Sequence, residues 1–324
     1  MNRIASIILI LVLGAINLQA QQFPDRGISL INNYTPDQYG QAGKIWAIES
    51  ADNGLVYFAA DRGLLTFNGE HWKRFVGSKG ITRSLLLPSD SVFYSGADKD
   101  FGQWHKNEYQ DYVFTSLNPF RESAKGLNEE FWGVHQIDED IIFVSFNNIY
   151  VYKEQQLTKI AAPSRFTGSF KTGGKVYLAD DKFGLYAFNG LRLTNVFPQI
   201  NDVGPIQIVG VHEDDQGLLI ITRDQGIFRF LAGKLTPMEL GVSADLQKNQ
   251  VFCFTTLDNH HFAFGTILNG IYITDKAGQI VQHINKQRGL QNNTILSLHY
   301  SEQGILWAGM DFGIAAIKLA SNIT

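Results

Sequence analysis

A pattern of apolar runs and tight turns that returns about every 40 to 45 residues is the feature that most constrains this fold. The stretch NGLVYFAADRGLLTFNGEHWKRF, residues 53–75, holds three short apolar runs separated by turns at Asp61-Arg62-Gly63 and Asn68-Gly69. The turn glycine recurs, with gaps of 39, 82, 42, 44 and 43 residues, at Gly63, Gly102, Gly184, Gly226, Gly270 and Gly313. The gap of 82 residues is about twice the others, so one copy lacks its glycine.

The missing place is occupied by Asn148, in the segment SFNNIYVY. Asparagine is the residue other than glycine that best tolerates the left-handed backbone of such a turn. The sequence therefore predicts seven repeats, and it predicts a positive φ at Asn148.

Each repeat contains an apolar first strand, a polar turn, a second strand, an Asp-rich turn, a third strand and a weaker fourth strand. Runs of four to seven β-branched and aromatic residues bounded by Gly, Asn and Asp are strand and hairpin signals. Four antiparallel strands per repeat are typical of a propeller blade, so we expect an all-β, seven-bladed β-propeller. The expected blades span residues 45–80, 81–120, 131–165, 166–204, 206–250, 251–294 and 295–319, the last completed by 28–35.

The last repeat predicts how the ring closes. It ends near Leu319 after only three strands. Ile284-Asn285 leads from the fourth strand of the sixth repeat into the first strand of the seventh, and the N-terminal Ile31-Asn32 stands in the same way before the first strand of blade one. We therefore expect the N-terminal strand to complete blade seven, which removes an open sheet edge. The single propeller then occupies residues 21–324.

Residues 1–20 read as a secretory signal peptide. Arg3 precedes an apolar run from Ile4 to about Ile16, and Ala20 offers a small residue for cleavage. The run is short for a membrane span, although an uncleaved anchor is the alternative. No later segment is apolar enough to cross a bilayer, so we expect a periplasmic or secreted protein that does not insert into the membrane after cleavage.

Charge and composition exclude several function classes. The net charge is −4, from 27 basic and 31 acidic residues that are interspersed, so we expect no nucleic-acid partner. Cys253 is the single cysteine and lies in the apolar stretch VFCFTTL, where we expect a buried small side chain. No phosphate loop, metal-binding motif or nucleophile motif occurs, so we expect no cofactor and favour a protein that is not an enzyme. A propeller enzyme stays open, because propellers can assemble a site from side chains far apart in the sequence.

Three histidines share one place near the end of the first strand, at His135, His212 and His299. Three histidines could bind a metal ion. However, they belong to alternating blades, and side chains of first strands mostly face the neighbouring blade. We therefore expect hydrogen bonds between blades and no metal site.

The turns between second and third strands carry the other recurring polar feature. An Asp in such a turn accepts backbone N–H bonds, so it needs no ligand to explain it. These turns nevertheless gather on one face of the disc, beside aromatic side chains such as Trp46, Phe101, Phe183 and Phe312. Carboxylates, amides and exposed rings suit a hydroxyl-rich ligand. The candidate ligand-binding residues are Asp61, Arg62, Asp98, Lys99, Trp104, Trp132, Asp181, Lys182, Arg223, Asp224 and Asp311.

The repeat NGLVYFAADRGLLTFNGEHW and its echo QGILWAGMDFGIAAI resemble the two-component regulator propeller repeats of periplasmic sensors in Bacteroidetes. The resemblance covers the mature chain and is strongest over residues 30–75 and 284–319. It implies extracytoplasmic ligand sensing, in some relatives of oligosaccharides, and it implies no catalytic residues. Those relatives continue into further domains, a membrane helix and a kinase or helix-turn-helix output, which do not follow here. A truncated receptor, a gene fragment and a stand-alone propeller remain open.

Two functions follow as hypotheses. The first is a sensor or interaction propeller that binds an oligosaccharide or a partner protein, with a membrane sensor kinase or regulator as its output. The second is a secreted propeller enzyme, a lyase or hydrolase acting on a glycan or peptide. Because a fold does not determine a function, the site must decide between them.

Overall fold

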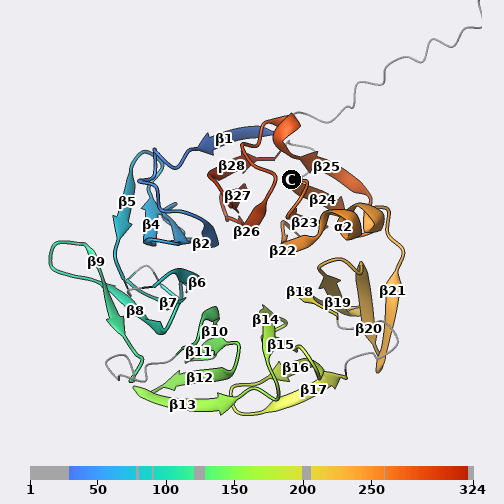
Figure 1. The fold of residues 1–324 in the computed structure, drawn as a ribbon, viewed down its shortest axis with the longest axis horizontal. Helices are drawn as coiled ribbons and strands as arrows, with labels where there is room; N and C mark the ends of the chain where they lie inside the picture. Colours follow the sequence, from blue (N-terminus) through green and yellow to red (C-terminus); the bar gives the residue numbers. More distant parts are fainter. Residues whose placement is uncertain are drawn as a thin grey trace, which may run out of the picture.

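The structure is a computed structural model that describes residues 29–77, 80–89, 91–119, 128–198, 206–258 and 260–319. Its strands form seven four-stranded antiparallel sheets, arranged as blades around a central axis (Figure 1). The predicted all-β seven-bladed propeller is therefore confirmed. The predicted signal peptide lies outside the described residues. Within the described residues, no helix is long and apolar enough to span a membrane.

The first four blades follow the chain in order, each running from the axis to the rim. Blade one contains β2 (Ile45–Ser50), β3 (Val56–Ala60), β4 (Gly63–Phe67) and β5 (Trp72–Phe75). Blade two contains β6 (Thr82–Leu86), β7 (Val92–Ala97), β8 (Asp100–Lys106) and β9 (Tyr112–Ser116). Blade three contains β10 (Phe131–Ile137), β11 (Asp140–Ser145), β12 (Asn148–Lys153) and β13 (Gln156–Ala161). Blade four contains β14 (Phe166–Thr172), β15 (Lys175–Asp180), β16 (Gly184–Phe188) and β17 (Leu193–Phe197).

The last three blades complete the ring. Blade five contains β18 (Ile208–Asp214), β19 (Gly217–Thr222), β20 (Ile227–Leu231) and β21 (Lys234–Met238). Helix α2 (Ser243–Asn249) leads into blade six, with β22 (Val251–Thr256), β23 (His261–Thr266), β24 (Ile271–Asp275) and β25 (Ile280–Ile284). The short helix η1 (Lys286–Arg288) precedes blade seven, with β26 (Ile295–Tyr300), β27 (Ile305–Met310), β28 (Ile314–Lys318) and β1 (Leu30–Tyr34).

The hydrophobic core lies between the blades. Seven clusters of buried side chains occur in the described part of the chain, and each joins two neighbouring blades. Middle strands such as β3 and β4 are buried along their whole length, because a neighbouring blade covers each face. This explains why these strands read as continuous apolar runs instead of alternating ones.

The ring closes as predicted. Strand β1 pairs antiparallel with β28, from Leu30 opposite Lys318 to Tyr34 opposite Ile314. Figure 1 shows the blue N-terminal strand on the outer edge of the red blade seven. Between blades seven and one, Trp307 and Ile314 pack in one cluster with Tyr39 and Phe58.

The predicted positive φ at Asn148 is wrong. Asn148 is absent from the residues with a left-handed backbone, although it begins β12 at the place where Gly63 begins β4. Its side chain is buried and donates a hydrogen bond from Nδ2 to Oε1 of the buried Glu129, at 2.9 Å. Hydroxyl groups of Ser145 and Tyr150 donate to the same carboxylate. The hydrogen bond of its amide, and not a left-handed backbone, therefore explains the asparagine at this place.

The predicted turn glycine of blade two is also wrong. Ala97 pairs with Asp100 across a turn in which Lys99 takes the left-handed conformation, with φ of 64°. Gly102 lies two residues further on, inside β8 and opposite Ser95. A Cβ atom there would lie 2.2 Å from the carbonyl oxygen of Thr115. Close backbone approach, not a turn, explains this glycine.

Candidate functional site

A β-bulge interrupts the innermost strand of every blade. In β2, for example, the pairing register shifts between Ile45 and Ala47 and leaves Trp46 unpaired. Such a bulge re-aims a side chain. The unpaired residues are Trp46, Arg83, Trp132, Thr167, Val209, Phe252 and Leu296.

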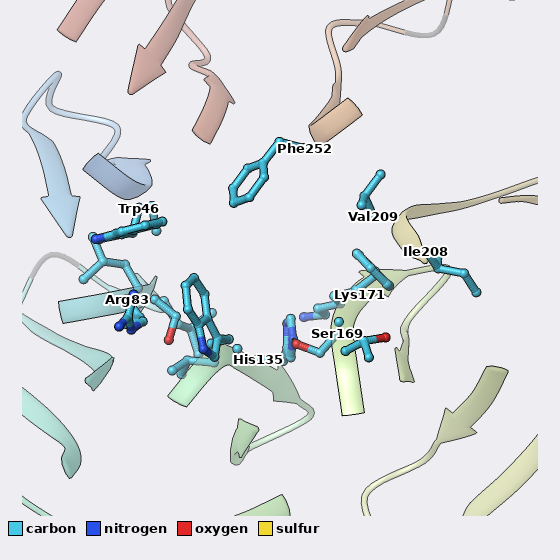
Figure 2. A pocket seen from close by; sticks show the side chains of 18 of the residues that line it. Trp46, Arg83, His135, Ser169, Lys171, Ile208, Val209 and Phe252 are labelled. Carbon is cyan, nitrogen blue, oxygen red and sulfur yellow. The ribbon is translucent and has the colours of Figure 1, made fainter. Parts of the chain in front are cut away.

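Six of these seven bulge residues line a cavity of about 600 Å³ at the centre of the ring. Figure 2 shows Trp46, Phe252, Val209 and Lys171 arranged around this space, from different blades. The wall also contains Glu49, His135 and Arg223. The volume is within the range of pockets that hold small-molecule ligands.

Two tryptophans and an arginine form a compact cluster in this wall. The Arg83 guanidinium carbon lies 4.2 Å from the ring centroid of Trp132 and 5.1 Å from that of Trp46. The two indole rings meet edge to face, with centroids 5.4 Å apart. Stacking of this kind combines cation–π attraction with packing and restrains all three side chains.

The carboxylates of Asp61, Asp98 and Glu130 hold the cluster in place. Asp98 accepts hydrogen bonds from Nε and Nη2 of Arg83 at 2.7 and 3.3 Å, and Glu130 lies 3.4 Å from the same guanidinium. The indole N–H of Trp46 donates to Asp61 at 2.7 Å, and that of Trp132 donates to Glu130 at 3.0 Å. These contacts preorganise the cluster before any ligand arrives.

Ten of the eleven predicted site residues divide into three groups. Trp132 and Arg223 line the cavity, and Asp61 and Asp98 support lining side chains. Asp311 forms an ion pair with Lys44 at 2.9 Å, and Asp181 accepts a hydrogen bond from Ser164. The exposed remainder, outside the cavity wall, consists of Arg62, Lys99, Lys182 and Asp224.

Trp104 does not belong to this site. Its side chain is fully buried, stacks on Phe93 with centroids 5.8 Å apart, and donates its N–H to Ser95 at 2.8 Å. Trp104 lies in β8, the third strand of blade two, and its ring packs between blades one and two. Trp104 was predicted to bind ligand because Gly102, two residues before it, reads as the turn glycine of blade two.

The expected hydrogen bonds between blades are confirmed for two of the three histidines. His135 bonds to Ser169 of the next blade and His299 bonds to Ser50 of the next blade, each at 2.8 Å. Burial lowers the pKa of each histidine to about 4, and Lys171 contributes at His135. His212 instead packs against the ring of Phe262, 5.5 Å away. The described residues contain no group of side chains that could hold a metal ion.

Glu49 is the carboxylate of the cavity wall. Its side chain keeps 36% of its surface open, and its Oε2 atom lies 3.9 Å from Nδ1 of His299. Burial among the inner strands raises the pKa of Glu49 to about 7. A carboxyl group with this pKa can exchange a proton near neutral pH.

Sequence reasoning missed Arg83, Glu49, Lys171 and Phe252 as lining residues. A signal for the bulge positions was present: a buried residue, the bulge residue and a small residue follow one another at IWA, TRS, FWG, FTG, IVG, VFC and ILS. The small residue allows the neighbouring blade to approach. Reading this triplet would have pointed to the cavity instead of the turns.

Comparison with known proteins adds evidence on the fold. No family model matches the sequence, and no curated protein matches it. Among solved structures, the extracellular domain of the putative hybrid two-component system BT4673 from B. thetaiotaomicron aligns with a TM-score of 0.69 and 17% identity. The alignment covers 90% of this chain and 40% of that one. The extracellular domain of the putative hybrid two-component system BT3049, from the same organism, aligns with a TM-score of 0.69 and 17% identity. That alignment covers 89% of this chain and 42% of the other.

An enzyme with the same fold is equally similar. Virginiamycin B lyase from Staphylococcus aureus aligns with a TM-score of 0.70 and 13% identity, over 90% of this chain and 99% of the lyase. The resemblance to sensor propellers is thus confirmed at the level of the fold. This chain spans less than half of the matched sensor domains, and sensor and lyase propellers both share its architecture.

Proposed function

We propose that the chain is an extracytoplasmic sensor propeller that binds an oligosaccharide in its central cavity. The observation that carries this proposal is the pair of indole rings, Trp46 and Trp132, held around Arg83 at the cavity wall. Sugar rings offer apolar C–H faces between their hydroxyl groups, so aromatic faces beside polar side chains suit them. Because the rings are already restrained, little ordering cost opposes binding.

The test is a thermal-shift screen of the mature protein against oligosaccharides. A ligand at a hundred times its Kd adds about 2.7 kcal/mol to the stability. Trp46→Ala and Trp132→Ala should then weaken the binding of each hit at least about tenfold. The control is Phe312→Ala, because this ring is 63% exposed and lies outside the cavity wall. Unchanged binding in both tryptophan variants would contradict the proposal.

We propose a periplasmic or secreted location and a membrane sensor kinase or regulator as the partner, because the matched neighbours are extracellular domains of hybrid two-component systems. Co-purification from a membrane extract with and without the ligand found above tests this step. A kinase that is retained only with ligand supports it.

Glu49 supports a second candidate, a lyase or hydrolase. Its pKa of about 7 suits a general base, and it lies in the same cavity. If the cavity is catalytic, the parent should consume ligands found in the screen, and Glu49→Gln should abolish turnover while retaining binding. A ligand recovered unchanged after long incubation favours the sensor.

A further inference from the structure

We propose that the ligand of the central cavity is an acidic oligosaccharide whose carboxylate or sulfate groups are bound by Lys171 and Arg223. The inference rests on the proposed function and adds the charge class of the ligand. It comes from the distribution of charge around the cavity.

The cavity wall is richer in positive charge than the chain as a whole. Its charged lining residues are the cations Arg83, Lys171 and Arg223 and the carboxylate Glu49, whereas the whole chain has a net charge of −4. Because Arg83 is neutralised by carboxylates behind the wall, the charges that face a ligand are those of Lys171 and Arg223 against the single carboxylate Glu49.

The three cations differ in their partners. Arg83 is paired with the carboxylates of Asp98 and Glu130 and is unavailable as an anion site. In the part of the chain that the structure describes, the Arg223 guanidinium donates only to neutral amides, at 3.1 Å to Gln250 and at 3.4 Å to Gln207. Within the described residues, no carboxylate lies within 4.0 Å of Lys171 or Arg223.

The amide contacts orient Arg223 without neutralising it. An amide oxygen accepts a hydrogen bond but carries no net charge, so the guanidinium keeps its positive charge and further N–H donors. Such a group is ready to form a charge-assisted hydrogen bond with a carboxylate or sulfate oxygen.

Lys171 supplies the second cation, at a different level along the axis of the ring from Arg223. It lies near the end of β14, whereas Arg223 follows β19 at the opposite end of its blade. Figure 2 shows Lys171 beside His135 and Ser169 at the cavity. Two cations at different depths match a chain of sugars with more than one acidic group, while Trp46 and Trp132 contact a ring.

Glu49 does not cancel this charge. It lies on blade one, whereas Lys171 lies on blade four and Arg223 on blade five. Its raised pKa also leaves part of the Glu49 population uncharged near neutral pH. An acidic ligand therefore meets attraction at one side of the cavity without full repulsion at the other.

The test uses three matched pairs of probes in isothermal titration: trigalacturonate and its methyl ester, triglucuronate and its methyl ester, and sulfated and unsulfated galactotriose. At least one acidic probe should bind at least about tenfold tighter than its neutral partner. Its affinity should fall as salt is added.

Variants then locate the contact. Lys171→Gln and Arg223→Gln should each weaken the acidic probe about tenfold, as expected for a charged hydrogen bond. Lys171→Arg should retain binding, and Arg62→Gln is the control because Arg62 is exposed outside the cavity wall. Melting curves show whether each variant is folded.

The outcomes separate the two proposals. If a neutral probe binds as tightly as its acidic partner, the acidic ligand is wrong and the oligosaccharide sensor stands. Acidic binding that survives the Lys171→Gln/Arg223→Gln double variant overturns the assigned cations. If no probe binds, the charge class is wrong for these sugars and the broader screen decides on the sensor.

Discussion

Buried polar side chains in this ring satisfy one another, and Asn148 shows the consequence most clearly. Its amide, with the hydroxyl groups of Ser145 and Tyr150, surrounds the buried carboxylate of Glu129. We expect Asn148→Gly to lower the free energy of unfolding by about 1–3 kcal/mol, because Glu129 loses a donor that water cannot replace. Urea unfolding measures this loss. Asn147→Gly is the control, since Asn147 is exposed, and equal stability of the two variants would contradict the account.

The inter-blade histidines predict a pH dependence of stability. Burial lowers the pKa of His135 and His299 to about 4, against about 6.5 in the unfolded chain. Between these values the unfolded state binds more protons at these two histidines, so their contribution to stability is complete above about pH 6.5 and is lost as the pH drops toward 4. We expect His135→Gln, which stays neutral, to lose less stability than the parent between pH 7 and pH 4.5. If the free energies of unfolding of the two proteins fall by the same amount over this pH range, the prediction is contradicted.

At the scale of single elements, the sequence predicted which segments form strands but not how the inner strands are interrupted. Hydrophobic runs and turn residues locate the strands, because those signals are local. A bulge depends on the pairing register, which a neighbouring strand sets. The cavity wall was therefore missed at Arg83 and Phe252, and Gly102 was misread as a turn residue although it marks close backbone approach.

The small residue that follows the bulge of an inner strand can contact the next blade directly. Ser84 and Ser297 donate hydrogen bonds to carbonyl groups of the next blade, at 2.9 and 3.0 Å. Cys253 occupies the same place in β22, with its sulfur 4.0 Å from the carbonyl oxygen of Ile295. Burial raises the pKa of its thiol, as expected for a packed side chain rather than a reactive one.

We therefore expect Cys253→Ser to be tolerated and Cys253→Val to be destabilising. Serine restores the donor found in blades two and seven. Valine adds volume where a Cβ at Gly265 would already lie 2.5 Å from the sulfur, so overpacking should cost about 1–3 kcal/mol. Thermal melting of the two variants compares them. A valine variant as stable as the serine variant would show that the side chain of residue 253 is not tightly packed against Gly265.

At the scale of the whole molecule, ring closure could be predicted because an incomplete last repeat and a matching N-terminal segment are both visible in the sequence. The cavity could not, because its wall combines residues from six blades. Closure by β1 also covers the otherwise open edge of β28.

Deletion of residues 21–36 should therefore cause aggregation or a large fall in melting temperature, because it removes β1 and exposes an unpaired strand edge. Deletion of residues 21–28 alone is the matched control, since it leaves the pairing from Leu30 to Tyr34 intact. Light scattering and thermal melting compare the two. A protein that lacks β1 and melts like the control would contradict the role of this strand.

The central claim is that a ligand binds among the inner strands, and fluorine NMR of the 5-fluorotryptophan-labelled protein tests it most directly. The chain contains five tryptophans, so each resonance can be assigned with a single Trp→Phe variant. On titration with a ligand found by the screen, the resonances of Trp46 and Trp132 should shift, while those of the inter-blade residues Trp72, Trp104 and Trp307 stay in place. Shifts confined to Trp72, Trp104 or Trp307 would contradict the claim and move the binding site away from the axis.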